Sequence, residues 1–196
     1  MRQYIPFGLF LCYALFFISC KQEIKESKTI PENPNTESSS ESAKKPLSPH
    51  TSTMAMIGDA HIHIDYSSPG VRDRIIFGGL LAYDQIWQAG AHMATWIESN
   101  KDLTIDGKVL PAGKYGFFTI PSKNEWTIIF NSNWNQHGKD DYNEKDDILR
   151  FKVKPNLSEE ITEHLEYKIN QVENNEGAIS LAWEKVSISF NFKVNP

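Results

Sequence analysis

The chain has 196 residues, of which 40% are hydrophobic, 12% aromatic and 23% charged. This composition is typical of a folded globular protein and excludes a chain that is disordered throughout. The formal net charge is −5 and no cluster of cations is seen, so the sequence disfavours nucleic acid as a partner. Both cysteines, Cys12 and Cys20, lie near the start, which excludes a disulfide framework, a cysteine-based zinc site and a cysteine nucleophile from the folded part.

Residues 1–19 are predicted to be a lipoprotein signal peptide. Arg2 precedes an apolar stretch over residues 5–18, which is shorter than the roughly 20 residues that cross a bilayer. The stretch ends in Phe17-Ile18-Ser19-Cys20, which resembles a bacterial lipobox, and Cys20 is the predicted lipidation site. The membrane is thus a predicted partner, bound through Cys20. The alternatives are an ordinary signal peptide cleaved near Ser19 and an uncleaved anchor.

Residues 20–50 are predicted to be a lipidated, disordered tether. From residue 21 on they contain no aromatic residue and are dominated by Ser, Glu, Lys, Pro and Asn, so they cannot bury enough apolar area to offset the entropy of ordering. A flexible coil of this length would reach on the order of 30 Å. The predicted location is the bacterial cell envelope, with a lipid anchor in the outer membrane and the domain facing the periplasm or the surface.

Residues 51–196 are predicted to form one all-β domain, an antiparallel β-sandwich or a barrel-like fold. Short segments of alternating polarity are separated by turn signals at close spacing. In the segment 61–66 the alternation is strict, with Ile62, Ile64 and Tyr66 on one face. Further strands are predicted over residues 103–105, 108–110, 115–120, 126–131, 148–153, 165–169 and 179–192.

Turn signals predict how some of these strands are joined. Asp106-Gly107 favours a hairpin with a type I′ turn, and residues 122–125 predict a second hairpin. The apolar phase shifts between Trp183 and Val186, which predicts a β-bulge near Glu184-Lys185. One or two short helical turns are predicted at residues 83–88 and 158–163, the latter with Ser158 as the N-cap.

Seven short blocks of sequence carry a family resemblance, and they are called the family blocks below. They are residues 74–80 (RIIFGGL), 86–95 (IWQAGAHMAT), 110–115 (LPAGKY), 118–121 (FTIP), 125–127 (EWT), 134–137 (WNQH) and 147–150 (DILR). In this order they resemble the domain-of-unknown-function family numbered 2911, common in Bacteroidetes envelope proteins, across residues 55–192.

The resemblance implies no activity. Many members of the family have Arg, Asn and Glu where this chain has Gln88, His92 and Met93. Any role of those three residues elsewhere in the family is therefore not transferred to this chain.

Histidines are the main candidate metal ligands. His61 and His63 must project from one face of a strand, with Asp65 next in line. Two imidazoles in this arrangement can both reach a zinc or copper ion at about 2.0–2.1 Å. His92 and His137, inside two family blocks, are candidate third and fourth ligands. The alternative is that His61, His63 and Asp65 form only a solvated strand face.

Other residues suggest a ligand site without a metal. Trp126 and Trp183 lie on apolar strand phases and are predicted to be core residues. Trp134 lies in a polar loop among Asn, Ser and Gln residues, where its side chain is a candidate contact for a carbohydrate or another ligand. The acidic stretch 140–147 lacks the ligand pattern of a calcium loop and is predicted to be a solvated loop.

Three hypotheses about function remain from the sequence. No signature of a catalytic nucleophile or a phosphate-binding loop is present, so an enzyme is not the favoured class. The favoured class is a tethered envelope module that binds a transition metal through its histidines. The second is a carbohydrate-binding, ligand-binding or protein-interaction module without metal, and the third is a metal-dependent hydrolase.

Overall fold

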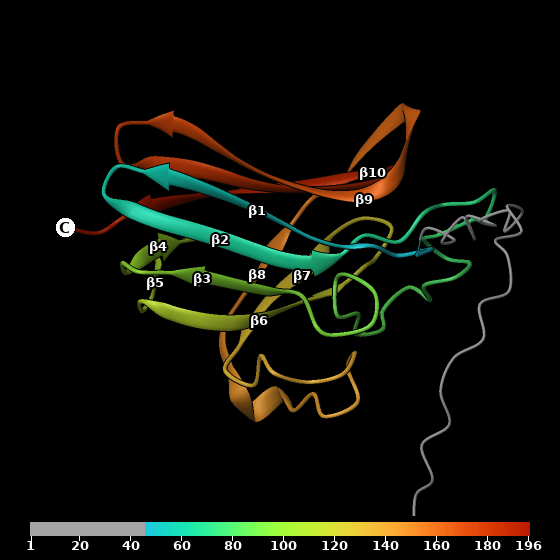
Figure 1. Cartoon of the computed structure of the whole chain (residues 1–196), viewed down its shortest axis with the longest axis horizontal. Coiled ribbons are helices and arrows are strands. Elements are labelled where there is room, and N and C mark those ends of the chain that lie inside the picture. Colours follow the sequence, from blue (N-terminus) through green and yellow to red (C-terminus); the bar gives the residue numbers. More distant parts are fainter. Residues whose placement is uncertain (1–45) are drawn as a thin grey trace, which may run out of the picture. The chain divides into compact units, whose positions relative to one another are not determined.

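Ten antiparallel strands in two sheets make up most of residues 46–196, which are the residues described by the computed structural model (Figure 1). Residues 1–45 lie outside the described residues, and with them the predicted signal peptide, Cys20 and most of the predicted tether. Within the described part, no helix has the length and apolar character needed to cross a membrane.

The larger sheet has six strands in the order β1-β2-β3-β6-β7-β8. The hairpin of β1 and β2 is at one edge, and β3 pairs with both β2 and β6. The first strand begins at His50, one residue before the predicted start of the domain. The six strands are β1 (His50–Ile57), β2 (Ala60–Ser67), β3 (Trp96–Ser99), β6 (Gly113–Ile120), β7 (Trp126–Asn131) and β8 (Asp147–Val153).

The smaller sheet has four strands in the order β5-β4-β10-β9. Its long strands β9 and β10 form a hairpin that curls across the larger sheet in Figure 1. The two sheets do not close into a barrel, so the fold is sandwich-like. The four strands are β4 (Leu103–Ile105), β5 (Lys108–Leu110), β9 (Asn156–Glu173) and β10 (Glu176–Val194).

The main core lies between the two sheets and is rich in aromatic side chains. Trp126 from β7 and Trp183 from β10 are both buried, as predicted. The segment between β2 and β3 adds Phe77 and Trp87, and the Trp87 ring stacks on Trp183 with centroids 5.8 Å apart. A loop segment therefore supplies large side chains to the centre of the sandwich.

The predicted turns and the predicted bulge are confirmed. Asp106 and Gly107 have φ angles of 50° and 73°, as a type I′ turn requires, and they join β4 to β5. The second hairpin joins β6 to β7 across residues 121–125. The pairing of β10 with β9 shifts register on both sides of Glu184, whose φ is 57°, at the predicted bulge.

The two predicted helical turns are wrong. The backbone near residues 83–88 pairs instead with β6, because Trp87 N donates to Thr119 O and Thr119 N donates to Trp87 O. Residues 158–163, including Ser158, belong to β9, where pairing with β10 supplies the backbone bonds that a helix would make internally. Within residues 46–196, the helical structure is one 3₁₀ turn, η1 (Glu144–Asp146), in the acidic loop.

Phe77 is predicted to stabilise the whole domain although it belongs to no strand. Its ring lies 4.9 Å from Trp126 and 6.1 Å from both Trp87 and Trp183, between centroids. We expect Phe77→Ala to lower the free energy of unfolding by about 3–5 kcal/mol, because a large buried side chain is lost. Urea unfolding of the chain without residues 1–20 measures this.

The matched control is Ile75→Ala in the same segment, since the Ile75 side chain is 72% exposed. That change should alter the free energy of unfolding by no more than about 0.5 kcal/mol. Similar losses in the two variants would contradict the packing described for Phe77.

Candidate site on the outer face of the six-stranded sheet

The face of the six-stranded sheet that points away from the main core carries the candidate site. In β2, Ile62 and Ile64 are fully buried, so the alternating residues His61, His63 and Asp65 point outward. Neighbouring strands add side chains on the same side, in register with these three. The outer face is defined here by Met54, Met56, His61, His63, Asp65, Trp96, Glu98 and Lys114.

The structure brings His61 and His63 side by side, as the alternation predicts. Their ring centroids are 6.2 Å apart. The His63 ring also makes an edge contact with Trp96, with centroids 4.9 Å apart. The Nε2 atom of His63 is buried and has no hydrogen-bond partner among the described residues. A polar atom in this state is uncommon in a folded protein and is a potential ligand atom.

Asp65 does not join the two histidines. Its Oδ1 atom lies 2.9 Å from His50 Nε2, at the start of β1. The other acidic residue of the outer face, Glu98, lies 3.4 Å from the Lys114 ammonium. Both carboxylates of the outer face therefore have cationic or hydrogen-bonding partners of their own.

His92 and His137 lie on segments that pair with each other. Gly138 N donates to His92 O at 2.8 Å, and Met93 forms an isolated bridge with His137. Both histidines are exposed, and His137 Nδ1 lies 3.2 Å from Asp140 Oδ2. Among residues 46–196, no group of three or more His, Cys, Asp or Glu side chains is placed to hold a metal ion. The four predicted histidine ligands thus do not converge.

Trp134 lies against Trp96 under a lysine. Their ring centroids are 6.3 Å apart, and Lys114 Nζ lies 3.8 Å from the Trp96 centroid and 4.7 Å from that of Trp134. These are cation–π distances. Gly116 permits the close approach, because a Cβ there would lie 3.2 Å from Asn133 O and from Trp134 Cα. The tryptophan predicted to contact a ligand is therefore packed onto the sheet.

Two hollows adjoin this region. The smaller, about 180 Å³, is bounded by Asp65, Trp96, Trp134 and Asn135 among others. The larger, about 790 Å³, lies where the chain enters β1 and is lined by residues of β9 such as Glu163 and His164. Typical pockets for small organic ligands are about 300–1,000 Å³, so the hollow beside the tryptophans is smaller than that range.

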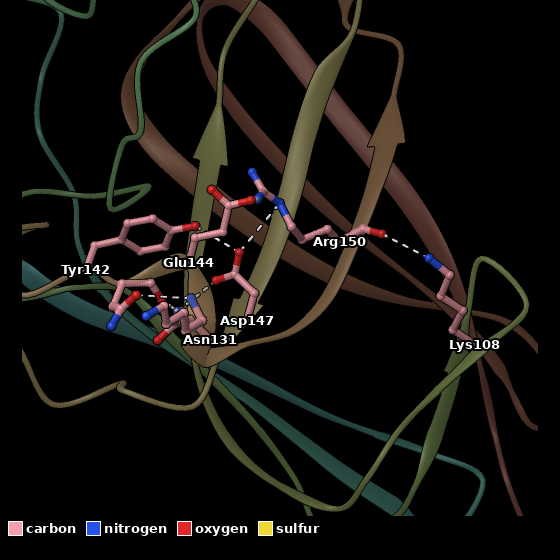
Figure 2. A network of polar contacts seen from close by, with 8 residues as sticks. Lys108, Asn131, Tyr142, Glu144, Asp147 and Arg150 are labelled. Atoms are coloured by element: carbon pink, nitrogen blue, oxygen red, sulfur yellow. Dashed lines mark hydrogen bonds and ion pairs between the residues drawn. The ribbon is translucent and has the colours of Figure 1, made fainter.

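A buried polar network closes the loop that carries Trp134 (Figure 2). The amide of Asn131 is fully buried and donates to Asp147 Oδ1 at 2.7 Å and to Asn143 O at 3.0 Å. The Tyr142 hydroxyl donates to Asp147 Oδ2 at 2.9 Å, and Arg150 contacts both Asp147 and Glu144. The network therefore fixes the two ends of the loop between β7 and β8.

The Asp147 carboxyl group is buried, in contrast to the solvated loop predicted for residues 140–147. Its side chain is 5% exposed. Burial raises the pKa of Asp147, and hydrogen bonds from Asn131 and Tyr142 oppose that rise. Burial also raises the pKa of Tyr142, with a further contribution from the Asp147 carboxylate. The sequence signal for this network is the polar Asn131 at the end of the otherwise mostly apolar strand β7.

The family model described as protein of unknown function (DUF2911) matches residues 48–192. The chain belongs to this family. No curated protein and no solved structure matches the chain. The family blocks contribute Trp87 and Trp126 to the core and Asp147 and Arg150 to the buried network, whereas none of them falls on β1 or β2. The histidine pair is thus outside the blocks on which the resemblance depends.

Asp147 is predicted to give the stability a distinctive pH dependence. Because its pKa is raised in the folded state, its contribution is fully present below the unfolded pKa of about 3.9 and is lost as pH rises through the folded pKa. We expect the free energy of unfolding of the native chain, minus that of Asp147→Asn, to fall as pH rises through this range. Urea unfolding at a series of pH values measures the difference.

The matched control is Asp141→Asn, an exposed residue of the same loop. A difference for Asp147→Asn that rises with pH would contradict the assigned direction of the pKa shift.

Proposed function

We propose that the protein is a lipid-anchored module of the bacterial cell envelope that binds a transition metal ion through His61 and His63. The observation that carries the proposal is the spacing of the two rings. An imidazole bound through nitrogen at about 2.0–2.1 Å has its centre roughly 3.2 Å from the ion, so two such rings lie at most roughly 6.4 Å apart. The 6.2 Å between the two centroids is close to this limit, so a tetrahedral ion shared by both rings requires them to move about 1 Å closer than they lie in the structure.

The buried Nε2 atom of His63 supports the same proposal. A buried polar atom without a partner costs about 1–3 kcal/mol of stability, and a metal ion that reached this nitrogen through a turn of the His63 side chain would remove that cost. Neutral imidazole nitrogen is the commonest metal ligand that a protein side chain offers. The proposed ion is therefore zinc or copper, the two ions that the sequence predicts.

The non-metal alternative has less support from the tryptophans. Lys114 lies over the rings of both Trp96 and Trp134, so at least one face of each ring is covered rather than open to a sugar. The hollow between them is also small, at about 180 Å³. A binding module without metal is therefore the second candidate, and Trp134 is its contact residue.

The hydrolase alternative has the least support. A metal-dependent hydrolase needs a general base within hydrogen-bond reach of the reacting water. The nearest carboxylates on the outer face, Asp65 and Glu98, are engaged with His50 and Lys114. A site that binds or transfers a metal ion needs no such base.

The metal proposal is tested by calorimetric titration with Zn²⁺ and with Cu²⁺ at neutral pH. We expect the chain without residues 1–20 to bind at least one of them, and the double variant His61→Ala, His63→Ala to lose that binding. The matched control is His92→Ala with His137→Ala, which removes two exposed histidines elsewhere and should leave binding unchanged. Loss of binding only in the control would contradict the proposal, and so would a native chain that binds neither of these two ions nor Cu(I).

The anchor proposal rests on the lipobox-like sequence that ends at Cys20. Cys20→Ala should release the protein from the membrane fraction or stop its processing, because the acylated residue is gone and a lipid anchor depends on the acyl chains. Labelling with radioactive palmitate and fractionation of cells measure the two effects. Unchanged labelling and unchanged membrane association of the variant would argue against Cys20 as the anchor.

A further inference from the structure

Two methionines lie directly beside the histidine pair. In the antiparallel pairing of β1 with β2, Met54 is opposite His63 and Met56 is opposite His61. Residues in such positions have Cβ atoms about 4.5–5.5 Å apart on the same face of the sheet. The four side chains therefore form a compact group near the end of the β1–β2 hairpin, and the group is called the Met-His quartet below.

Packing does not explain the two methionines. Met54 and Met56 are 58% and 56% exposed, whereas the alternate residues of β1, such as Ile57, face the core. On the outer face an exposed methionine buries little apolar area and contributes little to stability. The two side chains provide a pair of thioether sulfur atoms beside the histidines, and such sulfur atoms are soft metal ligands.

The oxygen ligands around the quartet are already engaged. Asp65 pairs with His50, Glu98 pairs with Lys114, and Asp59 in the hairpin turn lies 2.6 Å from Lys101 Nζ. Among residues 46–196, no group of three or more His, Cys, Asp or Glu side chains is accordingly placed to hold a metal ion here. The donor atoms left without such partners in the quartet are imidazole nitrogens and two thioether sulfurs.

We propose that the Met-His quartet (Met54, Met56, His61 and His63) is a binding site for monovalent copper, a proposal that rests on the metal-binding function proposed above. Thioether ligands select Cu(I), whereas hard divalent ions prefer oxygen. A set of four neutral ligands also suits a single positive charge better than the two charges of Zn²⁺, which no carboxylate of the quartet offsets. The ammonium group of Lys114 is held over the rings of Trp96 and Trp134, and the carboxylate of Glu98 beside it offsets its charge.

The experiment is a competition for Cu(I) against bicinchoninate in the absence of oxygen, with the chain without residues 1–20. The test variant is Met54→Leu with Met56→Leu, which keeps the size and the apolar character of exposed side chains and removes both sulfur atoms. The matched control is Met93→Leu, which changes the exposed methionine that follows His92 and lies opposite His137. Circular dichroism verifies that each variant is folded.

We expect the affinity of the test variant for Cu(I) to fall by about 100-fold or more, because loss of even an indirect partner of a metal ligand costs about 10–100-fold. Its affinity for Zn²⁺ and Cu²⁺ should stay unchanged, and Met93→Leu should bind Cu(I) like the native chain. The variant His61→Ala, His63→Ala should lose all three ions.

The two proposals fail in different ways. If the native chain and the test variant bind Cu(I) equally while the histidine variant does not, the quartet proposal is wrong and the histidine proposal stands. If the native chain binds none of the three ions, both proposals are wrong. If Met93→Leu rather than the test variant loses Cu(I), the copper site lies on the segment of His92 and His137.

Discussion

Burial of one face of β2 determines where the candidate ligands of this protein lie. Ile62 and Ile64 are completely buried in the sandwich, and because side chains alternate along a strand, His61 and His63 must face outward. A slip of one residue in the pairing of β1 with β2 would turn the histidines into the core and the isoleucines out to solvent. The hydrophobic core thus sets the register, and the register places Met54 opposite His63.

The rest of the outer face limits which chemistry remains open to that group. The carboxylates of Asp65 and Glu98, which would favour a hard divalent ion, are paired with His50 and Lys114. The loop that carries Trp134 packs on Gly116 and is closed by the buried Asn131–Asp147 network. What is left near the β1–β2 hairpin is a small set of neutral nitrogen and sulfur donors. The family model spans β1 and β2, but none of the family blocks lies on these two strands, which carry the proposed metal ligands.

Features that depend on neighbouring residues could be predicted from the sequence, and features that depend on distant pairing could not. The type I′ turn at Asp106-Gly107 and the bulge at Glu184 follow from local backbone preferences and a local change of phase. The separation of His92 and His137 from His61 and His63 depends on how remote loops dock. The burial of Asp147 likewise depends on the docking of β8 and its loop against Asn131 at the end of β7. The place of Met54 beside His63 follows from the short β1–β2 hairpin, whose first strand was not among the strands that the alternation pattern predicts.

The thioethers of β1 and the imidazoles of β2 are proposed to share one soft ion. The most direct test is NMR of the methionine methyl groups during titration with Ag⁺, which is a redox-inert analogue of Cu(I). Once residues 1–19 are absent, the chain has three methionines, Met54, Met56 and Met93, so the third is an internal reference. We expect the methyl signals of Met54 and Met56 to move together and to saturate at one Ag⁺ per chain, while that of Met93 does not move. A shift confined to Met93, or equal shifts of all three without saturation, would contradict it.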